Sequence, residues 1–75
     1  MNKLYEIVAE TFDIETDEID DAKGPDDIES WDSLGQLRLI SAIENHYLIT
    51  FEFGEMFEIM TIGDIKRILV KKGVI

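Results

Sequence analysis

Residues 33–47 read SLGQLRLISAIENHY, and the spacing of their apolar side chains predicts an amphipathic α-helix. At 100° per residue, one group of side chains falls within a sector of about 80°. This expected core face consists of Leu39, Ile40, Ile43 and Tyr47. A second stripe is expected to face outward and consists of Leu34, Arg38, Ser41 and Asn45. The helix should therefore bury one side against the rest of the chain.

The flanking segments predict three further helices. Apolar spacing predicts a first helix over residues 2–12, with Asn2 as a plausible N-cap. Residues 54–58 read as a short helix, and a capping-box pattern begins a last helix over residues 61–72. Residues 48–53 have the composition of a strand, but a lone strand would be unstable, so an extended connection is expected. The predicted fold is an all-α four-helix bundle, with three longer helices and a short third one, forming a single domain over residues 1–75.

An acidic loop joins the first two predicted helices. Residues 13–32 carry a Gly24-Pro25 turn signal and a possible helical turn near residues 16–20. Three isoleucines could hold this loop on the core, namely Ile14, Ile19 and Ile28.

The charge is distributed unevenly along the chain. Residues 1–32 contain twelve acids and two bases, whereas residues 33–75 contain five of each, so the net charge of −10 lies entirely before Ser33. Nucleic acid and anionic membrane surfaces would be repelled, and a basic partner would be attracted. No apolar run approaches the roughly 20 residues of a membrane span. The expectation is a cytoplasmic monomer without membrane insertion.

Ser33 at the start of the predicted helix permits two interpretations. With Gln36 it matches a Ser-x-x-Gln capping box, so it could be an ordinary N-cap, and Asp32 is an alternative cap. It could instead be an attachment point for a group that supplies chemistry the chain lacks. No cysteine is present, and a lone His46 offers no second ligand or nucleophile, so neither an enzyme site nor a metal site is expected. Glu18 stands where an EF-hand loop needs glycine.

Residues 29–44, ESWDSLGQLRLISAIE, resemble the modification segment of acyl carrier proteins. Tyr47, Phe51 and the segment Thr61–Ile65 continue the likeness over nearly the whole chain. The resemblance implies that a phosphopantetheinyl transferase attaches 4'-phosphopantetheine from coenzyme A to Ser33. Acyl groups would then be carried as thioesters on the arm, supplied by an acyl- or aminoacyl-loading ligase and passed to downstream transferases.

The resemblance also implies partner-recognition residues. Asp32 is expected to position the modifying enzyme and its metal, and Leu34 to contact partner enzymes. Gly35 and Arg38 stand where the family often has acids, so a basic docking patch would lose attraction at both positions. Phe53 also falls where an acid is often found, and it is the best candidate for an exposed aromatic contact. We therefore expect a carrier for a specialised pathway rather than for fatty-acid synthesis.

Two further features bear on access and cargo. Trp31 is expected to pack over the loop or to shape enzyme access to Ser33. The bulky residues around the short helix are expected to be mostly ordinary core, and as fillers they hint at short or polar cargo: Phe53, Met56, Phe57, Ile59 and Met60.

Two alternatives remain open at this point. One is an aminoacyl or peptidyl carrier of the same fold, loaded by an adenylating enzyme. The other is a small acidic helical adaptor in which Ser33 is only a helix cap.

Overall fold

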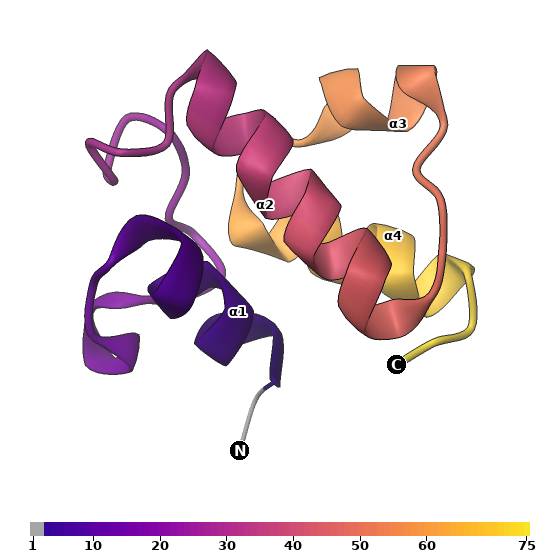
Figure 1. Ribbon diagram of the computed structural model, residues 1–75, viewed down its shortest axis with the longest axis horizontal. Helices are drawn as coiled ribbons and strands as arrows, with labels where there is room; N and C mark the ends of the chain where they lie inside the picture. The colour runs from indigo at the N-terminus through magenta and orange to yellow at the C-terminus, as the bar shows by residue number, and fades with distance from the viewer. Residues whose placement is uncertain (1–2) are drawn as a thin grey trace.

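The computed structural model describes residues 3–75, which contain four α-helices, one 3₁₀ turn and no strand (Figure 1). The elements are α1 (Lys3–Phe12), η1 (Thr16–Glu18), α2 (Ser33–Tyr47), α3 (Phe53–Glu58) and α4 (Ile62–Lys71). The predicted all-α fold is confirmed, with three longer helices, a short third helix and a long loop after α1. Residues 48–52 form a connection without helix or strand, as expected, in which Leu48 is left-handed and Glu52 is extended. The proposed N-cap Asn2 lies outside the described residues.

The helices share one hydrophobic core. In Figure 1, α2 crosses the front of the molecule, α4 lies behind it, and α1 and α3 flank it. The predicted core face of α2 is confirmed, because Leu39, Ile40 and Ile43 are buried and Tyr47 is half-buried against them. The predicted outward stripe is exposed throughout.

Buried apolar side chains and a backbone hydrogen bond both hold the loop between α1 and α2 on the core. Ile19 and Ile28 are buried, and Ile14 packs against the core at its edge. The backbone N–H of Ile62 donates to the Lys23 carbonyl at 2.9 Å, at the start of α4. The loop is therefore an ordered part of the fold that fixes the approach to α2.

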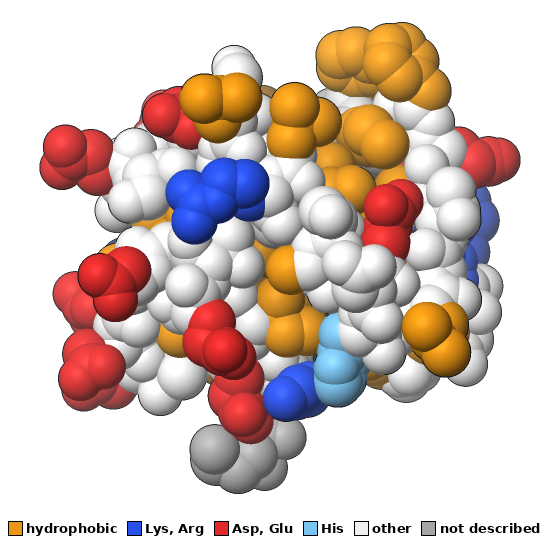
Figure 2. All heavy atoms as spheres, viewed as in Figure 1, with side chains coloured by type: hydrophobic (Ala, Val, Ile, Leu, Met, Phe, Trp, Pro, Cys, Tyr) orange, Lys and Arg blue, Asp and Glu red, His pale blue; other side chains and the backbone are white. Residues whose placement is uncertain are grey.

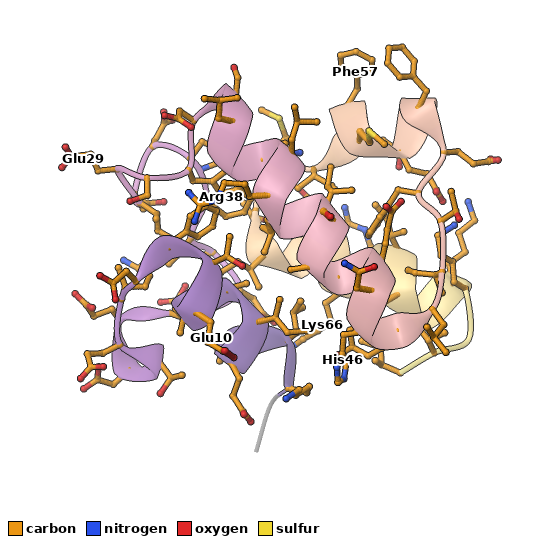
Figure 3. All side chains as sticks on the ribbon, in the orientation of Figure 1. Glu10, Glu29, Arg38, His46, Phe57 and Lys66 are labelled. Carbon is orange, nitrogen blue, oxygen red and sulfur yellow. The ribbon has the colours of Figure 1, made fainter. Side chains whose placement is uncertain are left out.

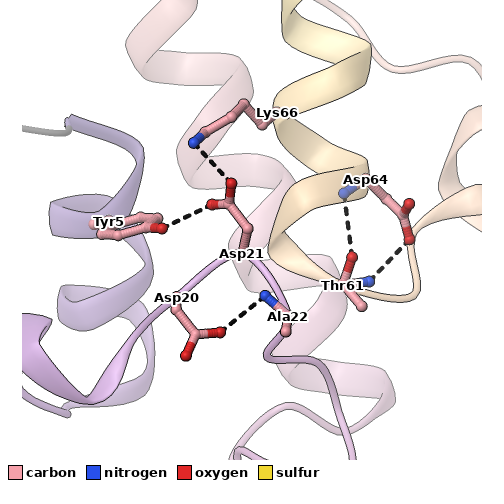
Figure 4. Close-up of polar contacts among 7 residues, drawn as sticks. All are labelled: Tyr5, Asp20, Asp21, Ala22, Thr61, Asp64 and Lys66. Atoms are coloured by element: carbon pink, nitrogen blue, oxygen red, sulfur yellow. Dashed lines mark hydrogen bonds and ion pairs between the residues drawn. The ribbon is translucent and has the colours of Figure 1, made fainter.

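A polar cluster around Asp21 ties the same loop to α1 and α4 (Figure 4). The Tyr5 hydroxyl donates to Asp21 Oδ1 at 2.7 Å, and Lys66 Nζ lies 3.0 Å from Oδ2. These two hydrogen bonds, Tyr5 first, lower the pKa of the Asp21 carboxyl, and the bond to Asp21 raises the pKa of Tyr5 to about 12. The ionised carboxylate and the protonated phenol are thus the forms that the fold favours.

We expect acid to destabilise the protein by protonating carboxylates that accept hydrogen bonds or form ion pairs in the folded state. The pKa values of Asp21, Glu55 and Asp64 are lowered on folding, so their contribution is complete above about pH 5 and is lost as the pH falls through the folded values. Thermal melts between about pH 7 and pH 3 measure this loss. Asp21→Asn should give a shallower decline of Tm with acid than the unchanged chain, and an identical decline would contradict the role of the Asp21 cluster.

The prediction that the residues around α3 are mostly core is wrong. Ile59 is buried and Met56 half-buried, but Phe57 and Met60 are exposed. Phe53 is exposed as well, which confirms the expected exposure of that one aromatic side chain. Phe53 and Phe57 are four residues apart and therefore share one side of α3, and that side is exposed, while Met56 packs against the core. The hint of short or polar cargo rested on these side chains as fillers, and their exposure removes its basis.

Candidate functional site

Asp32, not Ser33, caps α2. The Asp32 carboxylate accepts a hydrogen bond from the Gly35 N–H at 2.8 Å, and its backbone is extended, as an N-cap requires. Ser33 is the first residue of the helix and is exposed. The predicted Ser-x-x-Gln capping box is therefore wrong, because the side chain one residue earlier already occupies that role. The Ser33 hydroxyl makes no hydrogen bond to any residue within the described part of the chain.

Because Asp32 caps the helix and Ser33 does not, replacing the two side chains should change the stability of the fold by different amounts. Asp32→Ala should cost about 1 kcal/mol of unfolding free energy, because it removes an N-cap. Ser33→Ala should change the unfolding free energy by less than about 0.5 kcal/mol. Urea denaturation of the two variants beside the unchanged chain measures both effects. A larger loss for Ser33→Ala than for Asp32→Ala would contradict the assignment of the cap.

The first turn of α2 retains free backbone donors next to the Ser33 hydroxyl. The Gly35 N–H bonds to the cap and the Gln36 N–H bonds to the Asp32 carbonyl at 2.8 Å. The N–H groups of Ser33 and Leu34 have no acceptor among residues 3–75. Free donors and the helix dipole favour an anion at this end, so a phosphodiester on the Ser33 oxygen fits the residues present.

Ser33 lies at the edge of an apolar groove of about 600 Å³ between α2 and α3. Its walls are mainly hydrophobic side chains, including Leu37 and Ile40 from α2 and Met56 and Phe57 from α3. A group attached to Ser33 therefore has an apolar surface immediately beside it.

Trp31 is part of the structural support of this site. It is 2% exposed, its ring stacks on Phe12 with centroids 5.4 Å apart, and its indole N–H donates to Gln36 Oε1 at 2.5 Å. Gln36 Nε2 in turn donates to the Met56 carbonyl at 3.4 Å. Of the two roles expected for Trp31, the structure supports packing over the loop. The bridging role of Gln36 was missed, because the sequence pattern suggested only a capping residue.

Gly35 has a packing reason to be glycine. It is buried, and a Cβ atom there would clash with the Ser30 carbonyl oxygen and press on the Phe12 ring. An acid at this position would therefore displace the loop. The absence of charge at Gly35, which the sequence suggested was a feature of docking, follows from the close approach of the loop to α2.

The structure brings together most of the predicted site residues. Leu34 is 71% exposed beside Ser33, and Phe53 lines the same groove as Ser33. Arg38 is different, because it faces α1, where its guanidinium donates to the Thr11 carbonyl at 2.9 Å (Figure 3).

Two exposed side chains near the groove were missed from the sequence, Leu37 and Phe57. Leu37 follows Leu34 by three residues and Phe57 follows Phe53 by four, so in each pair the helical spacing alone places the second side chain beside the first.

Acidic and hydrophobic side chains gather on different parts of the surface. Figure 2 shows acidic side chains gathered over α1 and the following loop, whereas hydrophobic side chains protrude over α3. A larger hollow of about 970 Å³ lies on the acidic side, lined by Asp13, Glu18, Asp27, Glu29 and Asp32, among others, and it does not include Ser33.

Within residues 3–75, no cluster of His, Asp or Glu side chains could hold a metal ion. None of the helices described is long and apolar enough to cross a membrane.

The protein is small and helical, and at the N-terminus of α2, beside an apolar groove, it has an exposed serine whose hydroxyl makes no hydrogen bond within the described chain. This is the arrangement of a carrier domain. The family model for the phosphopantetheine attachment site matches residues 2–69, and the chain belongs to that family. Comparisons with curated proteins and with solved structures gave no match. Domains of this family bear covalent 4'-phosphopantetheine and are carriers rather than catalysts, so this protein is a carrier and not an enzyme. The adaptor interpretation, with Ser33 only a cap, is set aside by this match and by the cap at Asp32.

Proposed function

We propose that Ser33 carries the 4'-phosphopantetheine arm, and that the protein carries acyl intermediates as thioesters for a dedicated biosynthetic pathway. The observation that carries the proposal is the Ser33 hydroxyl, which is exposed and engaged in no hydrogen bond within the described chain. Attachment joins the Ser33 oxygen to the phosphorus of coenzyme A next to the pantetheine, releases adenosine 3',5'-bisphosphate, and passes the hydroxyl proton to the transferase. When bound, the arm supplies the thiol that the cysteine-free chain lacks.

Each neighbouring residue has a proposed part in this function. Asp32 holds the first turn in place and directs a carboxylate toward the transferase and its metal. Leu34 offers an apolar contact to partner enzymes on the exposed side of α2. Arg38 would reduce the attraction to a basic docking patch. We place the carrier as a monomer in the cytoplasm, where coenzyme A and the transferase are supplied.

To test this, the protein is incubated with coenzyme A and a promiscuous phosphopantetheinyl transferase, and its intact mass is then measured. The expected result is a gain of one phosphopantetheine unit. No gain by folded protein with several transferases would contradict the proposal.

The specialised pathway has its own test. A generic fatty acid synthase is expected to elongate poorly on the phosphopantetheine-bearing protein, because α2 has one acid, Glu44, and its carboxylate accepts the Phe51 N–H at 2.8 Å. Efficient elongation would contradict a dedicated role.

The same scarcity of acids on α2 favours one second candidate, an aminoacyl or peptidyl carrier loaded by an adenylating enzyme. Isolating the loaded protein from its host and identifying the cargo distinguishes the two. A carboxylic acid without an α-amino group supports the acyl carrier, and an amino acid or peptide supports the alternative.

A further inference from the structure

Helix α3 carries an aromatic pair that the described chain leaves uncovered. Phe53 and Phe57 are 74% and 71% exposed, and their rings pack edge to face with centroids 4.9 Å apart. Phe57 points away from the body of the molecule (Figure 3), and the apolar protrusion over α3 is plain in Figure 2. Exposed aromatic rings gain little from the fold itself. Contiguous apolar patches of this kind mark interaction sites.

The pair is continuous with the attachment site. Phe53 and Phe57 line the groove that Ser33 also lines, and Leu37 lines it from the α2 side. An enzyme that takes the end of the arm into its active site must cover the surface around Ser33. Such an enzyme would therefore meet these rings.

The carboxylates of α2 and α3 offer little to a basic partner. Glu44 binds the Phe51 N–H, while Glu55 accepts the Glu52 N–H at 2.8 Å and pairs with Lys72 at 3.0 Å. These bonds hold the acids within the carrier. On α3 itself, Glu58 is the one acid for which no such bond is described in residues 3–75. Charge complementarity on this side of Ser33 thus favours an apolar partner surface over a basic one.

A second copy of the chain is a weaker candidate than an enzyme for the partner that binds this aromatic pair. A stable dimer buries about 800 Å² per partner, roughly a sixth of the 4809 Å² surface of this protein. Three exposed large apolar residues line the groove, Phe53, Phe57 and Leu37, and Leu34 follows Ser33 on α2, which is too few to supply that area. A patch of this size suits a brief encounter with an enzyme, in which one or two aromatic anchors dominate the affinity.

We propose that the Phe53–Phe57 pair is the anchor for the enzyme that loads cargo onto the arm, and that this enzyme receives it in an apolar cleft at the mouth of its active site. The proposal rests on the carrier function proposed above. The arm-attaching transferase is assigned above to Asp32 and not to the two rings, so attachment of the arm should not depend on the pair. Attachment and loading would thereby use different side chains around one groove.

The test is to express tagged wild-type chain and Phe53→Ala/Phe57→Ala in the host, isolate both under acid, and measure intact masses. The fraction bearing phosphopantetheine should be equal in the two proteins. The fraction of that form which also carries cargo should fall about tenfold or more in the double variant. A matched control is Leu48→Ala/Val70→Ala, which removes exposed apolar groups away from the groove and should load normally. Thermal melts should show all three proteins equally folded.

The outcomes separate the two proposals. Wild-type chain that bears no arm, or an arm without cargo, contradicts the proposed function. Wild-type and double-variant proteins that load equally overturn the docking proposal alone, as does an equal loss in the control variant. Light scattering tests whether a second copy of the chain binds the pair instead. A concentration-dependent dimer that the double variant abolishes, while loading is unchanged, would assign the pair to self-association.

Discussion

Ser33→Ala is expected to abolish attachment of phosphopantetheine while leaving the fold intact. The hydroxyl oxygen is the only non-hydrogen atom that alanine removes, and the side chain that caps α2 is that of Asp32. Alanine also suits the first turn of a helix at least as well as serine. Intact mass after incubation with coenzyme A and a transferase should show full conversion of the wild-type chain and none of the variant.

Ser30→Ala is the matched control for this result. Ser30 is also exposed and lies three residues before Ser33 in the adjoining loop. It should convert at the wild-type rate, which shows that the enzyme tolerates a serine-to-alanine change nearby. Conversion of Ser33→Ala, or failure of Ser30→Ala while folded, would contradict the assignment of Ser33.

Trp31→Ala is expected to have the largest effect on stability. The ring is 2% exposed, stacks on Phe12 of α1 and donates to Gln36 of α2, so its loss opens a cavity where three segments meet. Truncation of a buried aromatic costs about 3–5 kcal/mol. Small domains have total stabilities near the lower end of about 5–15 kcal/mol. A fall in Tm of more than about 10 °C, or loss of cooperative melting, should follow.

Trp31→Phe separates packing from the hydrogen bond. Phenylalanine retains a ring to stack on Phe12 but has no N–H for Gln36, so the destabilisation should be well below that of Trp31→Ala. Circular dichroism melts and urea titrations measure both variants. A Trp31→Ala protein within about 1 kcal/mol of the wild-type chain would show that this residue does not hold the loop on α2.

The elements were predictable because their signals are local. The α2 core face follows from helical spacing, and the α4 start follows from a capping box in which Thr61 and Asp64 bond each other's backbone N–H groups. The exposure of Leu34 was predictable for the same reason. Each of these depends on residues within one or two turns of the chain.

What the sequence could not provide depends on contacts between distant segments. Whether Asp32 or Ser33 caps α2 is decided by backbone geometry that both residues could adopt. In the sequence, Gly35 suggests a missing docking charge, because its close approach to the Ser30 carbonyl is visible only in the structure. The residues around α3 are predicted to be mostly core because their apolar character is evident in the sequence, whereas the side of α3 that faces the core is not. The helices and the exposed residues of α2 could thus be predicted from the sequence, while the contacts that support the first turn of α2 could not.

The most direct test is to locate the arm on the protein isolated from its host, by proteolysis and tandem mass spectrometry. The chain has three serines, Ser30, Ser33 and Ser41, and their peptides can be distinguished by fragmentation. We predict phosphopantetheine on Ser33 alone. An arm on another residue, or protein that leaves the host without any arm, would contradict the assignment.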